Sequence, residues 1–306
     1  MNKKESFTGE NTELQNLAYK YYKENTEYLY LKYAVNEWKD EVDNSKDVTL
    51  VLGSSYSRNA IDPGCFGNML NCSVGGEDLY YSGLLYDKLR KGGVNIKTLF
   101  LFLGYYGLFQ ELRKEVNCRD VIEDILEPVI MDAPMNNALN SSVYSGHKEE
   151  IAELAYEIQK KKRYYYNDSN TRISHVLIKG GRWASYPDEE KVEEGRGRAY
   201  AHNKMEKYTE SYETNIRLFD EFAGKLKDDG VRLVVVIPPF SEHYVRFISK
   251  TMKEGLLSFL KDRKTEYIDY NDIDLFDEND FVDMDHLNGR GAYKFSRHLS
   301  RTFGCV

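Results

Sequence analysis

The fold of this chain is decided by residues 47–55, which read DVTLVLGSS. The apolar run is typical of a strand that is buried on both faces of a parallel sheet, and it ends at Gly53, followed by two serines. Much later, residues 281–289 read FVDMDHLNG and place Asp283 three positions before His286. A nucleophilic hydroxyl needs a base, and the base needs an orienting partner. We therefore expect the fold to bring Ser55 and His286 together.

Composition limits the classes of function. The chain has 306 residues, of which 41% are hydrophobic and 30% are charged, so it is long enough to form a substantial core. The net charge is −8 and no dense Lys/Arg stripe is interleaved with aromatic residues, which argues against a nucleic-acid partner. The nearest basic run, residues 160–163, is typical of a helix end.

Cysteines and termini give further expectations. Cys65, Cys72, Cys118 and Cys305 form no CxxC pair, so we predict no metal, no disulfide framework and no cofactor. The N-terminal residues lack an apolar stretch after their lysines, and nowhere do 18 apolar residues run together. These features predict a cytoplasmic protein without a transmembrane segment.

Strand-like and helix-like segments alternate along the chain. Residues 1–44 form an N-terminal extension that is helical from about 12 to 43, and it either packs on the main domain or docks a partner. Residues 45–306 contain five expected strands, at about 48–53, 68–73, 98–103, 232–237 and 265–269. Helices are expected near 79–89, 203–228, 242–262 and after Gly289. This alternation predicts an α/β fold with a parallel sheet between two helical layers.

A long insertion, at about 107–200, separates the third strand from the later elements. Helices are expected near 108–127 and 148–163, while 164–200 is polar and rich in Gly and Arg. Long segments between strands are commonly functional, so the insertion is expected to cover the site. Arg182 and Trp183 are candidates for binding a sugar or a carboxylate, the alternative being a surface loop.

Candidate site residues follow the strand ends. Ligands of open parallel sheets bind at the carboxyl ends of the strands. Ser55 follows the first expected strand, Gly75 and Gly76 follow the second, and the stretch GYYG at 104–107 follows the third. Asp283 and His286 follow the fifth. Each signal alone is weak, but their convergence at one sheet edge predicts a site there.

These motifs resemble those of the SGNH (GDSL-type) esterase and acyltransferase superfamily. Gly53-Ser54-Ser55 corresponds to the Gly-Asp-Ser block, and Asp283-Met284-Asp285-His286 corresponds to the Asp-x-x-His block. Within that superfamily the chain resembles the D-alanine transfer protein of teichoic-acid assembly and enzymes of surface-polysaccharide clusters. The resemblance implies a flavodoxin-like three-layer α/β/α sandwich with a five-stranded parallel sheet and a large helical insertion.

The resemblance also implies a Ser-His-Asp triad of Ser55, His286 and Asp283. Oxyanion donors would be the backbone N–H groups of Ser55 and Gly76, with Tyr106 standing where the family has an asparagine donor. The expected activity is hydrolysis or transfer of an acyl ester through an acyl-enzyme, on a carbohydrate or another small acyl ester. The alternative is a non-catalytic binding or scaffold protein of polysaccharide assembly on the same fold.

Three choices stay open at this point. Asp285 competes with Asp283 as the partner of His286. His202 is either a second base or an exposed side chain. Asn215, on the apolar side of its helix, makes either a buried structural hydrogen bond or a substrate contact.

Overall fold

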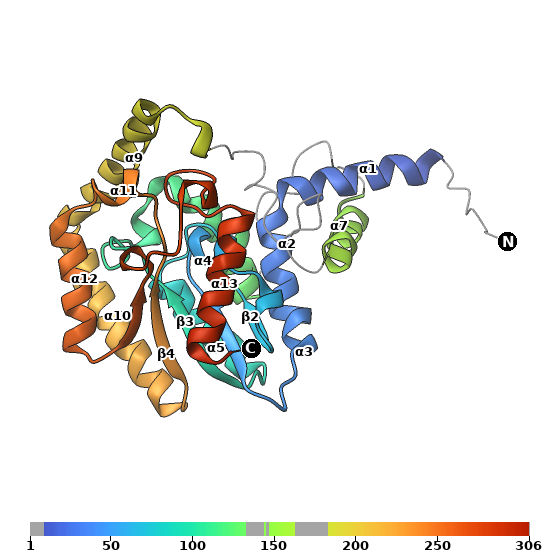
Figure 1. The fold of residues 1–306 in the computed structure, drawn as a ribbon. Helices are drawn as coiled ribbons and strands as arrows, with labels where there is room; N and C mark the ends of the chain where they lie inside the picture. The colour runs from blue at the N-terminus through green and yellow to red at the C-terminus, as the bar shows by residue number, and fades with distance from the viewer. Residues whose placement is uncertain (1–8, 133–143, 145–146, 163–182, 306) are drawn as a thin grey trace.

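Five parallel strands form one sheet in the order β2-β1-β3-β4-β5. The computed structural model describes residues 9–132, 144, 147–162 and 183–305 (Figure 1). The strands are β1 (Val48–Leu52), β2 (Met69–Asn71), β3 (Ile96–Phe102), β4 (Arg232–Ile237) and β5 (Glu266–Asp269). This strand order is that of flavodoxin-like doubly wound folds. The predicted fold class is therefore confirmed.

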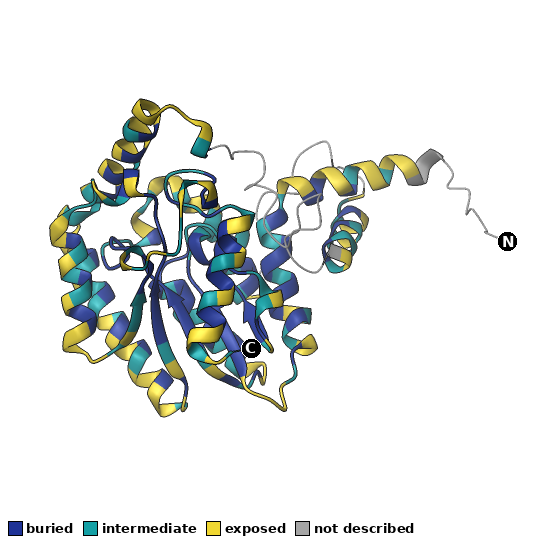
Figure 2. Cartoon of the chain, in the orientation of Figure 1, coloured by how far each residue is buried: buried dark blue, intermediate teal, exposed yellow. Residues whose placement is uncertain are grey.

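Helices cover both faces of the sheet. On one face, α13 (Gly289–Phe303) lies over β3, where Phe102 meets Phe295 at 5.7 Å between ring centroids (Figure 1). The other helical layer contains α5 (Leu79–Lys91), α10 (Thr209–Asp228) and α12 (Lys250–Asp262), which contact one another through aromatic pairs such as Phe219 and Phe259. Both faces of β1 are buried (Figure 2), which explains its unbroken apolar sequence.

The later part of the N-terminal extension, from Tyr30 on, belongs to the same core. It consists of α1 (Gly9–Glu24), α2 (Thr26–Tyr33), a π-helical turn (Ala34–Trp38) and α3 (Lys39–Glu41). Tyr30 and Trp38 are buried in the main core, and the Tyr30 hydroxyl donates to the Asn71 carbonyl at the end of β2 at 2.7 Å. The outer helix α1 packs against α7 (Lys148–Lys162). Docking of a partner on this extension stays a prediction.

Two expected helices are broken in the structure. The segment expected near 108–127 forms short turns and the short helix α6 (Glu127–Ile130), and the helix expected at 242–262 divides into α11 (Glu242–Val245) and α12. The break precedes Ser249, whose hydroxyl caps α12 by accepting the Met252 N–H. In the segment near 108–127 the short turns are Leu112–Lys114, Val116–Cys118 and the π-helical Val121–Leu126. Elsewhere in the described residues, short turns are formed by Pro63–Cys65, Trp183–Ser185, Lys204–Lys207, Tyr270–Asp272 and Glu278–Asp280.

A helix that the sequence did not predict, α9 (Asp188–Asn203), lies in the Gly- and Arg-rich part of the insertion. A Cβ atom on Gly195 would lie 2.1 Å from the His243 carbonyl oxygen in α11. Only glycine permits this approach of the two backbones, so the residue that weakened the helical pattern is the one that packs the helix.

The 18-residue stretch of apolar character that a membrane-spanning helix needs is found in none of the described helices.

Candidate active site

A tight turn at the end of β1 presents Ser55. Gly53 has a φ of 136°, and a Cβ there would lie 2.8 Å from the Cβ of Phe102. Glycine is therefore required by both the conformation and the close approach of β3. Ser54 precedes the short helix α4 (Ser55–Ala60), which begins at Ser55 itself. The turn consequently places the Ser55 hydroxyl at the carboxyl edge of the sheet.

A structured loop before α13 presents His286. Phe281 and Leu287 form an antiparallel bridge, and the Val282 N–H donates to the His286 carbonyl at 3.0 Å. Inside this loop, Oδ1 of Asp283 accepts the backbone N–H of Asp285 at 3.0 Å and that of His286 at 2.8 Å. Asp283 therefore shapes the turn that positions the imidazole.

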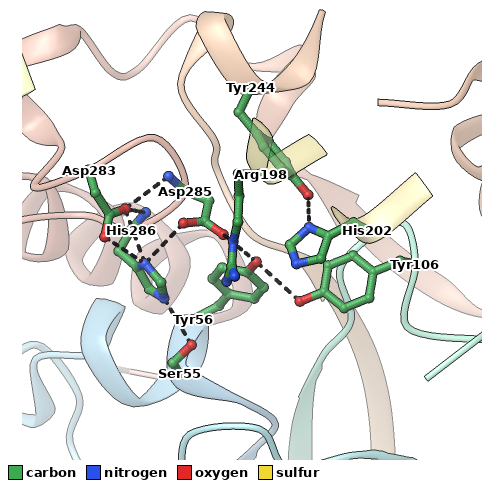
Figure 3. Close-up of polar contacts among 9 residues, drawn as sticks. All are labelled: Ser55, Tyr56, Tyr106, Arg198, His202, Tyr244, Asp283, Asp285 and His286. Atoms are coloured by element: carbon green, nitrogen blue, oxygen red, sulfur yellow. Dashed lines mark hydrogen bonds and ion pairs between the residues drawn. The ribbon is translucent and has the colours of Figure 1, made fainter. Parts of the chain in front are cut away.

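The structure brings Ser55, His286 and Asp283 into one chain of contacts (Figure 3). Oγ of Ser55 lies 2.9 Å from Nε2 of His286. On the other side of the ring, Nδ1 lies 3.1 Å from each carboxylate oxygen of Asp283. Oδ1 of Asp285 lies 3.2 Å from the same Nδ1. Two carboxylates thus share one imidazole nitrogen, and geometry alone does not choose between them.

Burial and partners distinguish the two carboxylates. The Asp283 side chain is 41% exposed, whereas that of Asp285 is 2% exposed. Oδ2 of Asp285 accepts from Nε of Arg198 at 2.7 Å and from the Tyr56 hydroxyl at 2.8 Å (Figure 3). Asp285 is therefore a buried charge held by a cation and a phenol, as a buried carboxylate requires.

The charges shift the acid–base properties of the site. Burial alone would lower the pKa of His286, but the carboxylates of Asp285 and Asp283 overcome it and raise that pKa to about 10. Burial alone would raise the pKa of Asp285, but His286 and Arg198 hold it well below its usual range. Burial and the Asp285 charge raise the pKa of Tyr56 well above its usual value, so the phenol stays a donor.

Tyr106 belongs to a network behind Asp285. Its hydroxyl donates to the Tyr56 hydroxyl at 3.1 Å, and its ring stacks on His202 with 3.9 Å between centroids (Figure 3). His202 is buried, and its Nδ1 lies 2.5 Å from the Tyr244 hydroxyl. The expected exposure of His202 is therefore wrong. Burial and the nearby Arg198 cation lower the pKa of His202 to about 3, so it is neutral near pH 7.

The loop after β2 is hydrogen-bonded to neighbouring segments at the carboxyl edge of the sheet. Glu77 is buried and accepts the backbone N–H of Gly53 at 3.2 Å and that of Val74 at 3.3 Å. The carbonyl of Gly76 accepts from the Gln110 side chain at 3.4 Å. Its neighbour Gly75 donates its N–H to a carboxylate oxygen of Glu27 at 2.9 Å. The expected role of Gly76 as an oxyanion donor stays a prediction.

A cavity of about 410 Å³ opens at the triad. It is lined by Glu27, Ser55, Arg58, Asn59, Trp183, Tyr186, Glu194, Val282, Asp283 and His286. The Trp183 side chain is fully buried, which contradicts the alternative of a surface loop, and it lines the cavity from the insertion. Arg182 lies outside the described residues. A larger cavity of about 580 Å³, between the loop after β3 and the start of α10, includes neither Ser55 nor His286.

Two groups of side chains within the described residues have metal-ligand spacing: Glu242 with His243 and Glu278, and Asp283 with Asp285 and His286. In the first group the Lys191 ammonium donates to Glu278 at 2.7 Å. In the second, Arg198 supplies the positive charge beside Asp285. A side-chain cation thus already accompanies one carboxylate of each group, Glu278 in the first and Asp285 in the second.

Sequence reasoning missed three residues of this region. Tyr56 directly follows the serine, Arg198 lies in the unpredicted helix α9, and Glu27 comes from the N-terminal extension. The sequence signal for Tyr56 was its adjacency to Ser55. The signal for Arg198 and for Glu27 was the charge of the side chain alone. Asn215 is structural: its Nδ2 donates to the Leu108 and Gln110 carbonyls at 3.1 and 2.6 Å.

Comparison with known proteins adds no family to this geometry. A scan against models of protein families gave no match, and a search of curated proteins gave no significant match.

Proposed function

We propose that this protein is a serine-dependent acyl-ester hydrolase or O-acyltransferase of the SGNH type. The observation that supports the proposal is the 2.9 Å contact between Ser55 Oγ and His286 Nε2 at the edge of a cavity. The opposite ring nitrogen lies against two carboxylates. A nucleophile, a base and an orienting group in this order are the arrangement that acyl transfer requires.

In the proposed reaction, the neutral form of His286, which becomes more populated as pH rises toward its raised pKa, removes the Ser55 proton as Oγ attacks the carbonyl carbon of the acyl ester. The ester C–O bond then breaks, and His286 returns the proton to the leaving alcohol. Water or a sugar hydroxyl attacks the acyl-enzyme next, its proton passing to His286 and then to Ser55. Hydrolysis and transfer differ only in this second nucleophile.

Other residues have assigned roles in this scheme. Asp283 orients the imidazole, and Asp285 adds a buried negative charge that stabilises the imidazolium. Backbone N–H groups of Ser55 and Gly76 are the proposed oxyanion donors, of which one is worth roughly 3–4 kcal/mol in such enzymes. Because the Tyr106 hydroxyl donates to Tyr56, we assign it no oxyanion role.

We propose a carbohydrate as the substrate or acceptor. Tyr186 belongs to the insertion, lines the cavity together with Ser55 and is 37% exposed, and the fully buried Trp183 packs behind it with 6.0 Å between ring centroids. Aromatic side chains at a cavity wall supply a flat apolar surface with polar edges, which suits a sugar ring. Arg182, also expected to contribute, lies outside the described residues.

Labelling with a serine-directed fluorophosphonate tests the proposal. We expect mass spectrometry to place one adduct on the peptide that contains Ser55, and Ser55→Ala to abolish it. Ser57→Ala is the matched control, because the Ser57 hydroxyl donates to the Ser54 carbonyl instead of contacting His286. Labelling of Ser55→Ala equal to that of the wild type would reject Ser55 as the nucleophile and favour a non-catalytic binding protein.

A further inference from the structure

The N-terminal extension places a carboxylate in the cavity beside Ser55. Glu27 lies in the first turn of α2 and lines the cavity with Ser55 and His286. Its Oε2 accepts the Gly75 N–H at 2.9 Å, and its Oε1 accepts from Nη1 of Arg58. Each carboxylate oxygen therefore has a donor of its own.

The two donors lie close to Ser55 in the sheet-edge scaffold, whereas the carboxylate comes from the N-terminal extension and is more exposed than Arg58. Arg58 lies three residues after Ser55 on α4, and its side chain is 4% exposed. Gly75 belongs to the turn after β2 at the same sheet edge. The Glu27 side chain is 29% exposed and can turn toward solvent. Nη1 of Arg58 and the Gly75 N–H both donate to the Glu27 carboxylate, so a ligand carboxylate that displaces Glu27 would meet the same two donors.

We propose that Arg58 and the Gly75 N–H form a binding subsite for a carboxylate of the ligand, which Glu27 occupies here. A guanidinium and a backbone N–H on separate oxygens match the planar geometry of a carboxylate. Arg58 and Glu27 line the cavity of Ser55, so the anionic group belongs to the acyl chain or to an acidic sugar. That this ligand is a substrate rests on the proposed function, whereas the anion site does not.

Isothermal titration calorimetry tests the site without turnover. In a Ser55→Ala background, glutarate represents an acidic acyl chain, glucuronate an acidic sugar, and glutaramide and glucose their neutral counterparts. Glu27→Gln removes the competing charge, and we expect it to tighten binding of one of the two acids by about tenfold, the value of a hydrogen bond to a charged group. The acid that gains identifies the source of the carboxylate.

Control variants separate this site from general electrostatics. Glu194→Gln removes another carboxylate from the same cavity lining, and we expect it to change binding less than about twofold. Glu27→Gln with Arg58→Met removes both charges and should abolish the gain. Should that variant unfold, Glu27→Gln with Arg58→Lys keeps the charge but loses the planar fork, and we expect it to lose most of the gain.

Three results would overturn the site: no gain in Glu27→Gln, an equal gain in Glu194→Gln, or an equal gain for the neutral ligands. The outcomes remain distinct from those of the labelling experiment. A gain in Glu27→Gln without labelling of Ser55 would support the anion site and reject the enzyme. Labelling of Ser55 without a gain in Glu27→Gln would support the enzyme and reject the anion site.

Discussion

Replacing Asp285 and Asp283 separately by asparagine tests the electrostatics of the site. Both carboxylates lie within 3.2 Å of Nδ1 of His286, so each stabilises the imidazolium and raises the pKa of His286. Asparagine keeps the shape and removes the charge. We expect both variants to lower the pKa of His286, and Asp285→Asn to lower it more.

The magnitudes follow from burial. At 3.1 Å, a charge pair screened as in water is worth about 1.3 kcal/mol, or roughly one pKa unit, and this value suits Asp283, which is 41% exposed. At an effective dielectric constant of about 20, a pair 3.2 Å apart is worth about 5 kcal/mol, and this limit applies to Asp285, which is 2% exposed. Arg198 offsets part of the charge of Asp285, so we expect a decrease of at least about two units.

The measurement is an NMR titration of His286, together with kcat/KM against pH for a small aryl acetate. A neutral imidazole is the base, so the rising limb of kcat/KM should move to lower pH in both variants and further in Asp285→Asn. Asp277→Asn is the control, because that carboxylate pairs with Arg290. A shift in Asp283→Asn that equals or exceeds that in Asp285→Asn would refute the reasoning. Asp283→Ala should cause a larger loss of kcat than Asp283→Asn, because alanine also removes the Oδ1 that accepts the backbone N–H of His286.

The other predictions concern stability. Gly53→Ala should destabilise the fold by about 2–4 kcal/mol in urea unfolding, because φ is positive and Phe102 is too close; Gly83→Ala, a helical site with open space, should stabilise it or be neutral. Tyr56→Phe should cost about 1–3 kcal/mol by removing a buried hydroxyl that donates to Asp285, and no loss would show that the contact is dispensable. The pKa of His286 is raised in the folded state, so its contribution is complete below about pH 6.5 and is lost as pH rises toward 10. Wild-type protein should therefore lose more stability than His286→Gln between pH 7 and pH 10, and parallel curves would contradict the raised pKa.

The sheet could be predicted because its signals are local. The strands β1, β3 and β4 are apolar runs with clear ends, and β1 stops at a glycine. Ser55 and His286 follow strand ends, and topology alone brings such positions to one edge. Their contact could therefore be expected from the order of elements, although 231 residues separate them in the sequence.

The supporting residues could not be predicted because their roles depend on tertiary packing. Gly195 and Gly197 in α9 lower its helix propensity. The charged Arg198 adds nothing to an apolar stripe along the helix. Its position is fixed by the close approach of Gly195 to α11, which no local pattern encodes. His202 was expected to be exposed, but it is buried by Tyr106 and Tyr244 from other elements.

The site is therefore assembled from parts that look peripheral in the sequence. Glu27 comes from the N-terminal extension, and Trp183 and Arg198 come from the insertion, yet each lies at the cavity or against Asp285. Because Arg198 partners Asp285, the buried carboxylate beside the imidazole, a change in the position of α9 alters the charge balance at His286. Because Glu27 of α2 pairs with the buried Arg58, the proposed anion subsite depends on the position of α2. The strand ends thus supply Ser55 and His286, and the N-terminal extension and the insertion supply charged partners and lining residues of the cavity.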